Sequence, residues 1–260
     1  MSKEIDKRQA LAVKAALEVG KMLLAAFGKK LSIRAKGDRD LVTNIDKKAE
    51  SLILKAIKKH FPNDGILSEE SPHLPSHSGF RWIIDPIDGT HNFIHQIDVF
   101  GISLALAFEE KVVAGVIYMP FTRELYQAQK GKGAFSNGKR IRVSRRPLRE
   151  ATMIYDSSIR LDKERMLKSL GELSEQVFNV RMFGSTARSL TYVAAGRAEM
   201  EIEFSDKVWD FAAGLLLVEE AGGESTDFAG EPWTLATREY IASNGIVHKQ
   251  VVNIIKRAEQ

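Results

Sequence analysis

The spacing of hydrophobic residues changes along the chain from helical to strand-like and back. Apolar residues recur on one helical face in two N-terminal segments, the second of which ends near 61–62. Short apolar runs then predict strands around 80–84, 99–108, 111–118 and 124–129. Helical spacing returns near 162–175, 186–195, 209–221 and 247–258. This mixture predicts a layered α/β (or α+β) sandwich, with one half at 1–150 and a second, intimately packed half at 151–260.

The apolar run at 82–84 leads directly into two acids, Asp85 and Asp88, followed by Gly89. Pro86 cannot donate to a sheet ladder, so we expect the strand to end there and a helix to follow. Open α/β sheets build their sites at strand ends, and helix N-termini bind anions. Two acids beside an anion-binding backbone make chemical sense if cations lie between them. The segment therefore favours a metal-dependent phosphate ester hydrolase, and the alternative is an ordinary turn rich in Asp, Pro and Gly.

Three further segments place acids in similar settings. Asp46 begins the second predicted helix, where it also fits a capping box with Thr43 and a favourable position in the helix dipole. Glu69 ends a short apolar run, and its alternative is a residue of a solvated loop. Asp210 lies in the first turn of a nearly all-apolar helix, where Asp206 already offers a cap, and a buried carboxylate there requires a partner.

Phosphate monoesters hydrolyse so slowly that a catalyst needs up to ~10²¹-fold acceleration, whereas acid–base catalysis contributes about 10²–10⁴-fold. Metal ions roughly 3.5–4 Å apart can activate water and neutralise the leaving oxygen, and all-oxygen ligands favour Mg²⁺. The chain contains no cysteine and no Gly-x-Ser-x-Gly elbow, which disfavours a direct nucleophile. His91 and His95 have a spacing that could bind zinc, but the chain has no His-Glu-x-x-His pattern, and we interpret His91 as a hydrogen-bonding neighbour or a surface residue.

In their order along the chain, these four acidic segments resemble the inositol monophosphatase family, within the lithium-sensitive, magnesium-dependent sugar phosphatases. The resemblance covers about 11–252. Its most specific motifs are Asp-Pro-Ile-Asp-Gly-Thr at 85–90 and Trp-Asp-x-Ala-Ala-Gly at 209–214. The resemblance implies the layered αβαβα sandwich of the inositol monophosphatase and fructose-1,6-bisphosphatase type, commonly dimeric, with the site between the two halves.

The resemblance also implies a ligand set for two to three Mg²⁺ ions. Glu69, Asp85 and the carbonyl of Ile87 are expected to hold the first ion. Asp85 is expected to bridge to a second ion, which Asp88 and Asp210 also hold. A third, weaker ion is expected near Glu69.

Catalytic and substrate roles follow from the same resemblance. Thr90, with Asp46 behind it, is expected to orient and deprotonate the attacking water, while the backbone amides of Gly89 and Thr90 bind phosphate oxygens. The implied substrate contacts are Gly184, Ser185, Thr186 and Glu203. A carboxylate at Glu203 suits the vicinal hydroxyls of a polyol, and its alternative is an exposed glutamate at a strand end. Arg188 could bind a second phosphate, and its alternative is a helix-surface arginine.

Charge and hydropathy set the remaining expectations. The net charge of +4 and the pI of about 9.1 are mild. A cationic cluster precedes the second helix, and we interpret it as a solvated face that helps to attract phosphate rather than as a nucleic-acid patch. It comprises Lys29, Lys30, Arg34, Lys36 and Arg39. Asp38 and Asp40 could reach a third ion. The absence of a secretory leader and of a run approaching ~20 apolar residues predicts a cytoplasmic protein with no membrane partner.

The sequence thus predicts a Mg²⁺-dependent phosphatase of inositol monophosphates, acting as a homodimer on a small sugar or polyol phosphate. Fructose-1,6-bisphosphatase activity is the alternative or a second activity. A non-catalytic role in RNA or transcription complexes is a different class of function that some family members have. The presence of all the expected acids argues against it.

Overall fold

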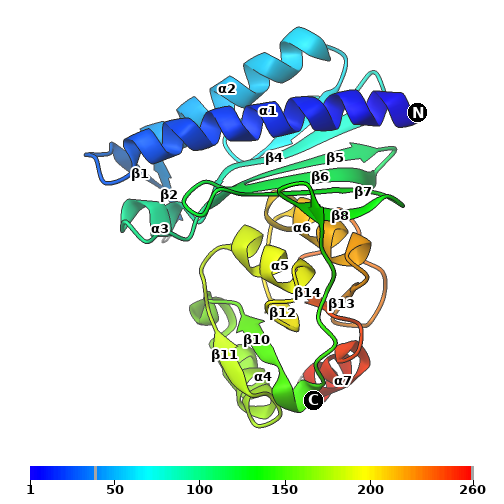
Figure 1. Cartoon of the computed structure of the whole chain (residues 1–260). Helices are drawn as coiled ribbons and strands as arrows, with labels where there is room; N and C mark the ends of the chain where they lie inside the picture. The colour runs from blue at the N-terminus through cyan, green and yellow to red at the C-terminus, as the bar shows by residue number, and fades with distance from the viewer. Residues whose placement is uncertain (38–39, 259–260) are drawn as a thin grey trace.

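Helices and sheets alternate in five layers (Figure 1). The computed structural model describes the chain at residues 1–37 and 40–258. The layers are the α1/α2 pair, a seven-stranded sheet, the α5/α6 pair, a five-stranded sheet and the α4/α7 pair. The helices are α1 (Ser2–Ala26), α2 (Asn44–His60), α3 (Thr90–Ile94), α4 (Lys163–Ser174), α5 (Thr186–Ala194), α6 (Val208–Glu220) and α7 (His248–Ala258), with 3₁₀ turns η1 (Leu148–Glu150) and η2 (Ile159–Asp162). This is the layered αβαβα sandwich that the sequence predicted.

The seven-stranded sheet has the order β3-β4-β5-β6-β7-β8-β9 and is antiparallel apart from the parallel pair β3–β4. Its strands are β3 (Gly65–Ser68), β4 (Phe80–Asp88), β5 (Gly101–Phe108), β6 (Lys111–Met119), β7 (Glu124–Gln129), β8 (Gly133–Ser136) and β9 (Lys139–Arg140). Apart from it, β1 (Ile33–Gly37) pairs with β2 (Asp40–Thr43), just before α2.

The five-stranded sheet is mixed and has the order β11-β10-β12-β14-β13. Its strands are β10 (Thr152–Tyr155), β11 (Asn179–Arg181), β12 (Met200–Glu203), β13 (Glu224–Asp227) and β14 (Tyr240–Ser243). In β12, Met200 and Ile202 pack in the core with α4 and α7, so the alternate residues of the strand face the α5/α6 layer. That alternation places two glutamates, Glu201 and Glu203, on the side of the central layer.

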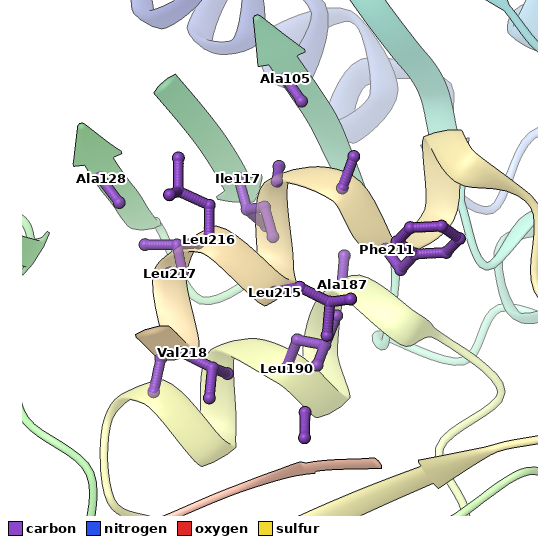
Figure 2. Packing of buried hydrophobic residues seen from close by; sticks show 14 of the residues in the cluster. Ala105, Ile117, Ala128, Ala187, Leu190, Phe211, Leu215, Leu216, Leu217 and Val218 are labelled. Carbon is purple, nitrogen blue, oxygen red and sulfur yellow. The ribbon is translucent and has the colours of Figure 1, made fainter. Parts of the chain in front are cut away.

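The central helix α6 is apolar on all sides because it is covered on both faces. In Figure 2, Leu216 points toward the strands that carry Ala105 and Ile117, whereas Leu215 points toward α5. Contact with the seven-stranded sheet is close. A Cβ on Gly115 of β6 would lie 2.9 Å from the carbonyl oxygen of Ala213, so this position requires glycine. Close packing here fixes the first turn of α6 beside the ends of β4 and β5.

The boundary between the two predicted halves falls where η1 precedes β10, and the division at 150/151 itself stays a prediction. Within the described part of the chain, no helix is both long and apolar enough to cross a membrane.

Candidate active site

A pocket of about 570 Å³ is lined by the C-terminal ends of β4 and β12, the segment after β10, and the first turns of α3, α5 and α6. Every predicted site residue except Asp46 lines it. Those lining residues are Glu69, Asp85, Ile87, Asp88, Gly89, Thr90, Gly184, Ser185, Thr186, Glu203 and Asp210. Asp46 lies directly behind Thr90 and contacts its hydroxyl group. Residues from both halves of the chain therefore meet in one pocket.

The expectation that β4 ends at Pro86 is wrong, because the strand continues to Asp88. Pairing with β5 becomes irregular there: Asp85 lies opposite Ser103, and the register shifts before Asp88. The irregularity accommodates a proline that has no N–H to donate. Both carboxylates are held by local donors. Asp85 Oδ1 accepts the N–H of Ile87 at 3.0 Å, and Asp88 accepts the hydroxyl of Ser185.

Concentrated negative charge dominates the electrostatics around Glu69, Asp85, Asp88 and Asp210. Burial, followed by repulsion from Glu69, Asp88 and Asp210, raises the pKa of Asp85 well above its ordinary value. Burial likewise raises the pKa of Asp88 to about 6, although the hydrogen bond from Ser185 opposes the shift. Burial and then Asp206 raise the pKa of Asp210. For all three acids, burial opposes the ionised form, and for Asp85 and Asp210 the neighbouring carboxylates oppose it further.

Within the described residues, no group of three or more His, Asp or Glu side chains is already arranged as a metal cage. The donor set of the carboxylates consists only of oxygen atoms, which suits a hard divalent cation.

Asp46 has both of the roles that the sequence left open. Its Oδ2 accepts the backbone N–H of Thr43 at 2.8 Å, while Thr43 Oγ1 accepts the N–H of Ile45, so the α2 capping box is present. Its Oδ1 accepts the hydroxyl of Thr90 at 2.8 Å. The side chain is fully buried. One carboxylate oxygen therefore fixes the helix start and the other orients Thr90.

Gly89 connects β4 to α3 in a conformation that other residues adopt only with strain. Its φ is +82°, and a Cβ at this position would lie 2.9 Å from the carbonyl oxygen of Val99. The turn allows α3 to begin at Thr90, which places the amides of Gly89 and Thr90 at the helix start beside Asp88.

Sequence reasoning missed Glu50. It lies one turn after Asp46 on α2, is 4% exposed, and accepts hydrogen bonds from the hydroxyls of Ser68 and Ser71. It also accepts the N–H of Glu70 at 3.2 Å. Glu50 thus holds the segment that carries Glu69. The available signal was its i,i+4 spacing from Asp46 on an otherwise buried helix face.

In the second half of the chain, the hydrogen-bond partners of Asp206 and Asp210 differ from the prediction. Lys207, not Asp206, is the N-cap residue of α6, and Asp210 accepts the N–H of Lys207 at 2.8 Å. Asp206 instead accepts the hydroxyls of Thr186 at 3.0 Å and Tyr240 at 2.9 Å. The expectation that Asp206 caps this helix is therefore wrong, and Asp210 itself holds the N-cap backbone.

Two alternatives for single residues are also corrected. Glu203 is not an exposed strand-end residue, because it is 8% exposed and lines the pocket. Arg188 is neither a surface arginine nor a lining residue. It is 3% exposed, and its guanidinium binds Glu124 Oε2 at 2.7 Å and Thr122 Oγ1 at 3.0 Å, which ties α5 to the start of β7. Among the described residues, the arginine that lines the pocket is Arg160 of η2, which the sequence gave no reason to select.

Two candidate ligands of a third ion, Asp38 and the side chain of Asp40, lie outside the described residues.

The two histidines that could have bound zinc are described by the structure. The rings of His91 and His95 pack against each other with centroids 4.3 Å apart, and His91 lines the pocket. Their arrangement gives no support to a zinc site.

A family model described as the inositol monophosphatase family matches residues 4–260. The chain belongs to the inositol monophosphatase family. Its curated relatives include the fructose-1,6-bisphosphatase/inositol-1-monophosphatase of Thermotoga maritima, 37% identical over 94% of this chain and 93% of the relative. Another relative is the Nus factor SuhB of Escherichia coli, 36% identical over 93% of each chain.

Solved structures agree with the family assignment. The extragenic suppressor protein SuhB of Bartonella henselae is 38% identical with a TM-score of 0.93, over 95% of this chain and 98% of that chain. A second structure, an IMPase/NADP phosphatase complexed with Mg²⁺ and phosphate, is 27% identical with a TM-score of 0.84, over 97% and 95% of the two chains. The predicted family and fold are confirmed, and the protein is a phosphatase of the inositol monophosphatase family.

Proposed function

We propose that this family member hydrolyses inositol monophosphates to inositol and phosphate in a Mg²⁺-dependent reaction. The observation that carries the proposal is the meeting of four acids with a hydroxyl–carboxylate pair in one pocket. Glu69, Asp85, Asp88 and Asp210 line the pocket together with Thr90, whose hydroxyl is bound by Asp46. We call the first four residues the metal-site acids.

The metal-site acids fit Mg²⁺ because they supply only oxygen ligands, and two of them, Asp85 and Asp88, are buried. Glu69, Asp85 and the carbonyl of Ile87 would hold one ion, Asp85, Asp88 and Asp210 a second, and the surroundings of Glu69 a third. Bound Mg²⁺ would lower the pKa of the attacking water and stabilise the leaving oxygen. A solved relative complexed with Mg²⁺ and phosphate supports Mg²⁺ as the ion.

The remaining steps use groups of this chain. Asp46 accepts the proton of the Thr90 hydroxyl in a hydrogen bond, so lone pairs of Thr90 Oγ1 are directed elsewhere. Thr90 Oγ1 can then take a proton from the attacking water while its own hydroxyl proton passes to Asp46 Oδ1, and the same hydrogen bond orients a lone pair of the water toward phosphorus. The amides of Gly89 and Thr90, at the start of α3, would bind phosphate oxygens as charge develops on them.

Substrate recognition would come mainly from the second half. The buried carboxylate of Glu203 faces the pocket and can accept hydrogen bonds from vicinal hydroxyls. The hydroxyls of Ser185 and Thr186 are already bound to Asp88 and Asp206. These two residues and Gly184 would therefore shape the pocket and contact substrate chiefly through the backbone.

Phosphate release from myo-inositol 1-phosphate and fructose 1,6-bisphosphate, each with Mg²⁺ and with a chelator, tests the proposal. We expect release from inositol 1-phosphate that the chelator abolishes, and the ratio of the two rates distinguishes the two activities. A higher kcat/KM for fructose 1,6-bisphosphate would instead favour the alternative, which the name of the Thermotoga maritima relative supports. No release from either ester with Mg²⁺ would contradict the proposal. We also expect Li⁺ inhibition and a homodimer, measurable in the same assay and by light scattering.

A role in a transcription complex is a second candidate because relatives of similar identity are named Nus factor SuhB. The two functions separate experimentally. A variant without Asp85 should lose turnover while retaining any such assembly.

A further inference from the structure

A cationic segment connects the seven-stranded sheet to the five-stranded sheet. Residues 139–149 contain six Lys and Arg residues and no acid, so their positive charges outnumber the net charge of +4 of the whole chain. In Figure 1 this segment is part of the green stretch after β8 that crosses the layers toward α7. We call residues 139–149 the basic strip. Its cations, all of them exposed, are Lys139, Arg140, Arg142, Arg145, Arg146 and Arg149.

The basic strip is fixed to the body of the protein. Ile141 and Val143 are partly buried and pack against the core around α5 and α6, while Arg142 between them is exposed. Further along, Asn244 Nδ2 donates to the backbone carbonyl of Arg146 at 3.0 Å. The strip therefore holds its apolar side chains inward and presents its charges to solvent in a defined arrangement.

Most of these charges have no acidic partner within the described part of the chain. Arg146 is an exception, because its Nε donates to Oε1 of the fully buried Glu199 at 2.7 Å, which anchors the strip just before β12. Arg149 has only a long contact of 3.6 Å with the exposed Glu150. The strip cations that form no ion pair among the described residues are Lys139, Arg140, Arg142 and Arg145.

The end of the basic strip lines a groove of about 820 Å³ beside α7. Arg149, Lys256 and Arg257 line this groove together with three amide side chains, and none of its described lining residues is acidic. Lys256 has a neutral partner, the carbonyl oxygen of Ala229. The groove shares no lining residue with the active-site pocket and has the opposite charge. It extends the cationic surface of the strip into a concave one.

An exposed aromatic ring lies close to this groove. Phe178 is 75% exposed, more than any other large hydrophobic side chain that the structure describes. It follows the groove residue Gln176 by two positions, and its N–H donates to the carbonyl oxygen of Ala151, directly after η1, at 3.0 Å. A ring so exposed contributes little to the core. Beside a row of cations it can stack on a nucleic-acid base.

We propose that the basic strip and the adjoining groove bind single-stranded nucleic acid, with the arginines on phosphate groups and Phe178 on a base. A guanidinium group binds phosphate through two parallel donors. Stacking accepts any base, because every base has a π-face. The inference goes beyond the proposed function and does not depend on it, since it uses neither the active-site pocket nor Mg²⁺.

Fluorescence anisotropy of a labelled oligouridylate of about 12 nucleotides tests the binding. The oligonucleotide is titrated with the full chain at several salt concentrations and without Mg²⁺. We expect saturable binding whose logarithmic affinity falls linearly with the logarithm of the salt concentration, with a slope of about −0.7 for each phosphate contact. No saturable binding at low salt would overturn the proposal.

Paired substitutions test the site. Arg142→Gln with Arg145→Gln removes two exposed cations of the strip, so the affinity should fall and the salt slope should become shallower by about 1.4. Lys14→Gln with Lys21→Gln removes two exposed cations of α1 and is the matched control, which should keep the wild-type affinity and slope. Wild-type affinity and slope in the arginine variant would overturn the assignment to the strip.

Phe178→Ala distinguishes a nucleic acid from an acidic protein segment, which would use the cations but not the ring. We expect this variant to bind the oligouridylate about tenfold more weakly, which corresponds to about 1.4 kcal/mol, with an unchanged salt slope. Phe178→Tyr keeps an aromatic ring and should bind like the wild type. Wild-type affinity of the alanine variant, together with equal competition by polyglutamate, would assign the surface to an acidic protein and overturn the proposal.

Phosphate release from myo-inositol 1-phosphate, measured with Mg²⁺ on the same variants, keeps the two proposals separate. We expect every variant to retain the wild-type rate, because none of the substituted residues lines the active-site pocket. Failure of nucleic-acid binding would therefore leave the proposed function standing, and failure of phosphate release would leave the binding proposal standing.

Discussion

The metal-site acids and a second group of acids, Asp156, Glu203 and Asp206, lie in the same pocket but are fixed by different parts of the fold. Asp85 and Asp88 sit on one irregular strand of the seven-stranded sheet, and Glu50 on α2 secures the neighbouring segment that carries Glu69. The second group comes from the five-stranded sheet and the loop before α6. The comparison teaches that bond breaking and substrate choice depend on separate elements. Substitutions among the metal-site acids should therefore lower turnover, whereas substitutions in the second group should mainly change KM.

The largest expected effect is at the metal end. Asp85→Asn removes the carboxylate assigned to bridge two ions, so we expect Mg²⁺-dependent turnover to fall by at least about 10³-fold. The measurement is phosphate release, accompanied by calorimetric titration with Mg²⁺ and by circular dichroism to verify the fold. Near-normal turnover in the folded variant would remove the two-ion assignment.

A smaller loss is expected at Thr90. Thr90→Val keeps the shape of the side chain but removes the hydroxyl that Asp46 orients. We expect kcat to fall by about 10²-fold, within the range of acid–base catalysis, with KM changed much less. Thr90→Ser is the matched control and should retain most of the activity. If the valine variant were as active as the serine variant, the water-activating role would be wrong.

Glu50→Gln tests whether the metal end depends on its support from α2. The NH₂ group of glutamine is a donor and cannot accept the hydrogen bonds that Glu50 accepts from Ser68, Glu70 and Ser71. The segment at 68–71 should therefore be held less tightly. We expect Mg²⁺ affinity to fall by about tenfold, measured by calorimetry and by the Mg²⁺ concentration for half-maximal rate. Activity at saturating Mg²⁺ should largely recover. Glu18→Gln, at an exposed position on α1, should change neither quantity. Unaltered Mg²⁺ affinity in the Glu50 variant would show that the segment holds its own position.

The smallest effect is expected for a neutral substitution at Glu203 assayed on myo-inositol 1-phosphate. Glu203→Gln keeps an acceptor for inositol hydroxyls, so KM for myo-inositol 1-phosphate should rise only about fivefold, or about 1 kcal/mol, with little change in kcat. A loss as large as that of Asp85→Asn would contradict the separation of the two ends.

The sequence predicted what depends on local chain chemistry. The all-apolar character of α6 indicated a helix covered on both sides, and the acids at Asp46, Asp85 and Asp88 were visible because each stands beside a turn or helix start. The errors concern contacts between segments far apart in the chain. The hydrogen-bond partners of Asp206 depend on how α5 and β14 pack around it.

Arg188 illustrates the same limit, because its burial depends on Glu124, 64 residues away. The error at Pro86 has another origin. A strand irregularity allowed β4 to pass through the proline, and the sequence contained no separate signal for that irregularity. Asp156 was overlooked because nothing in its local sequence sets it apart from a surface turn.

The most direct test of the central claim, that the pocket uses carboxylate-held Mg²⁺ to hydrolyse a phosphate monoester, is a reversible metal-removal experiment. Phosphate release from myo-inositol 1-phosphate would be followed before chelation, after chelation, and after Mg²⁺ is restored in excess. The account predicts that release stops with the chelator and returns with Mg²⁺. Release that continues at an unchanged rate in the chelator, or none at any Mg²⁺ concentration, would contradict it.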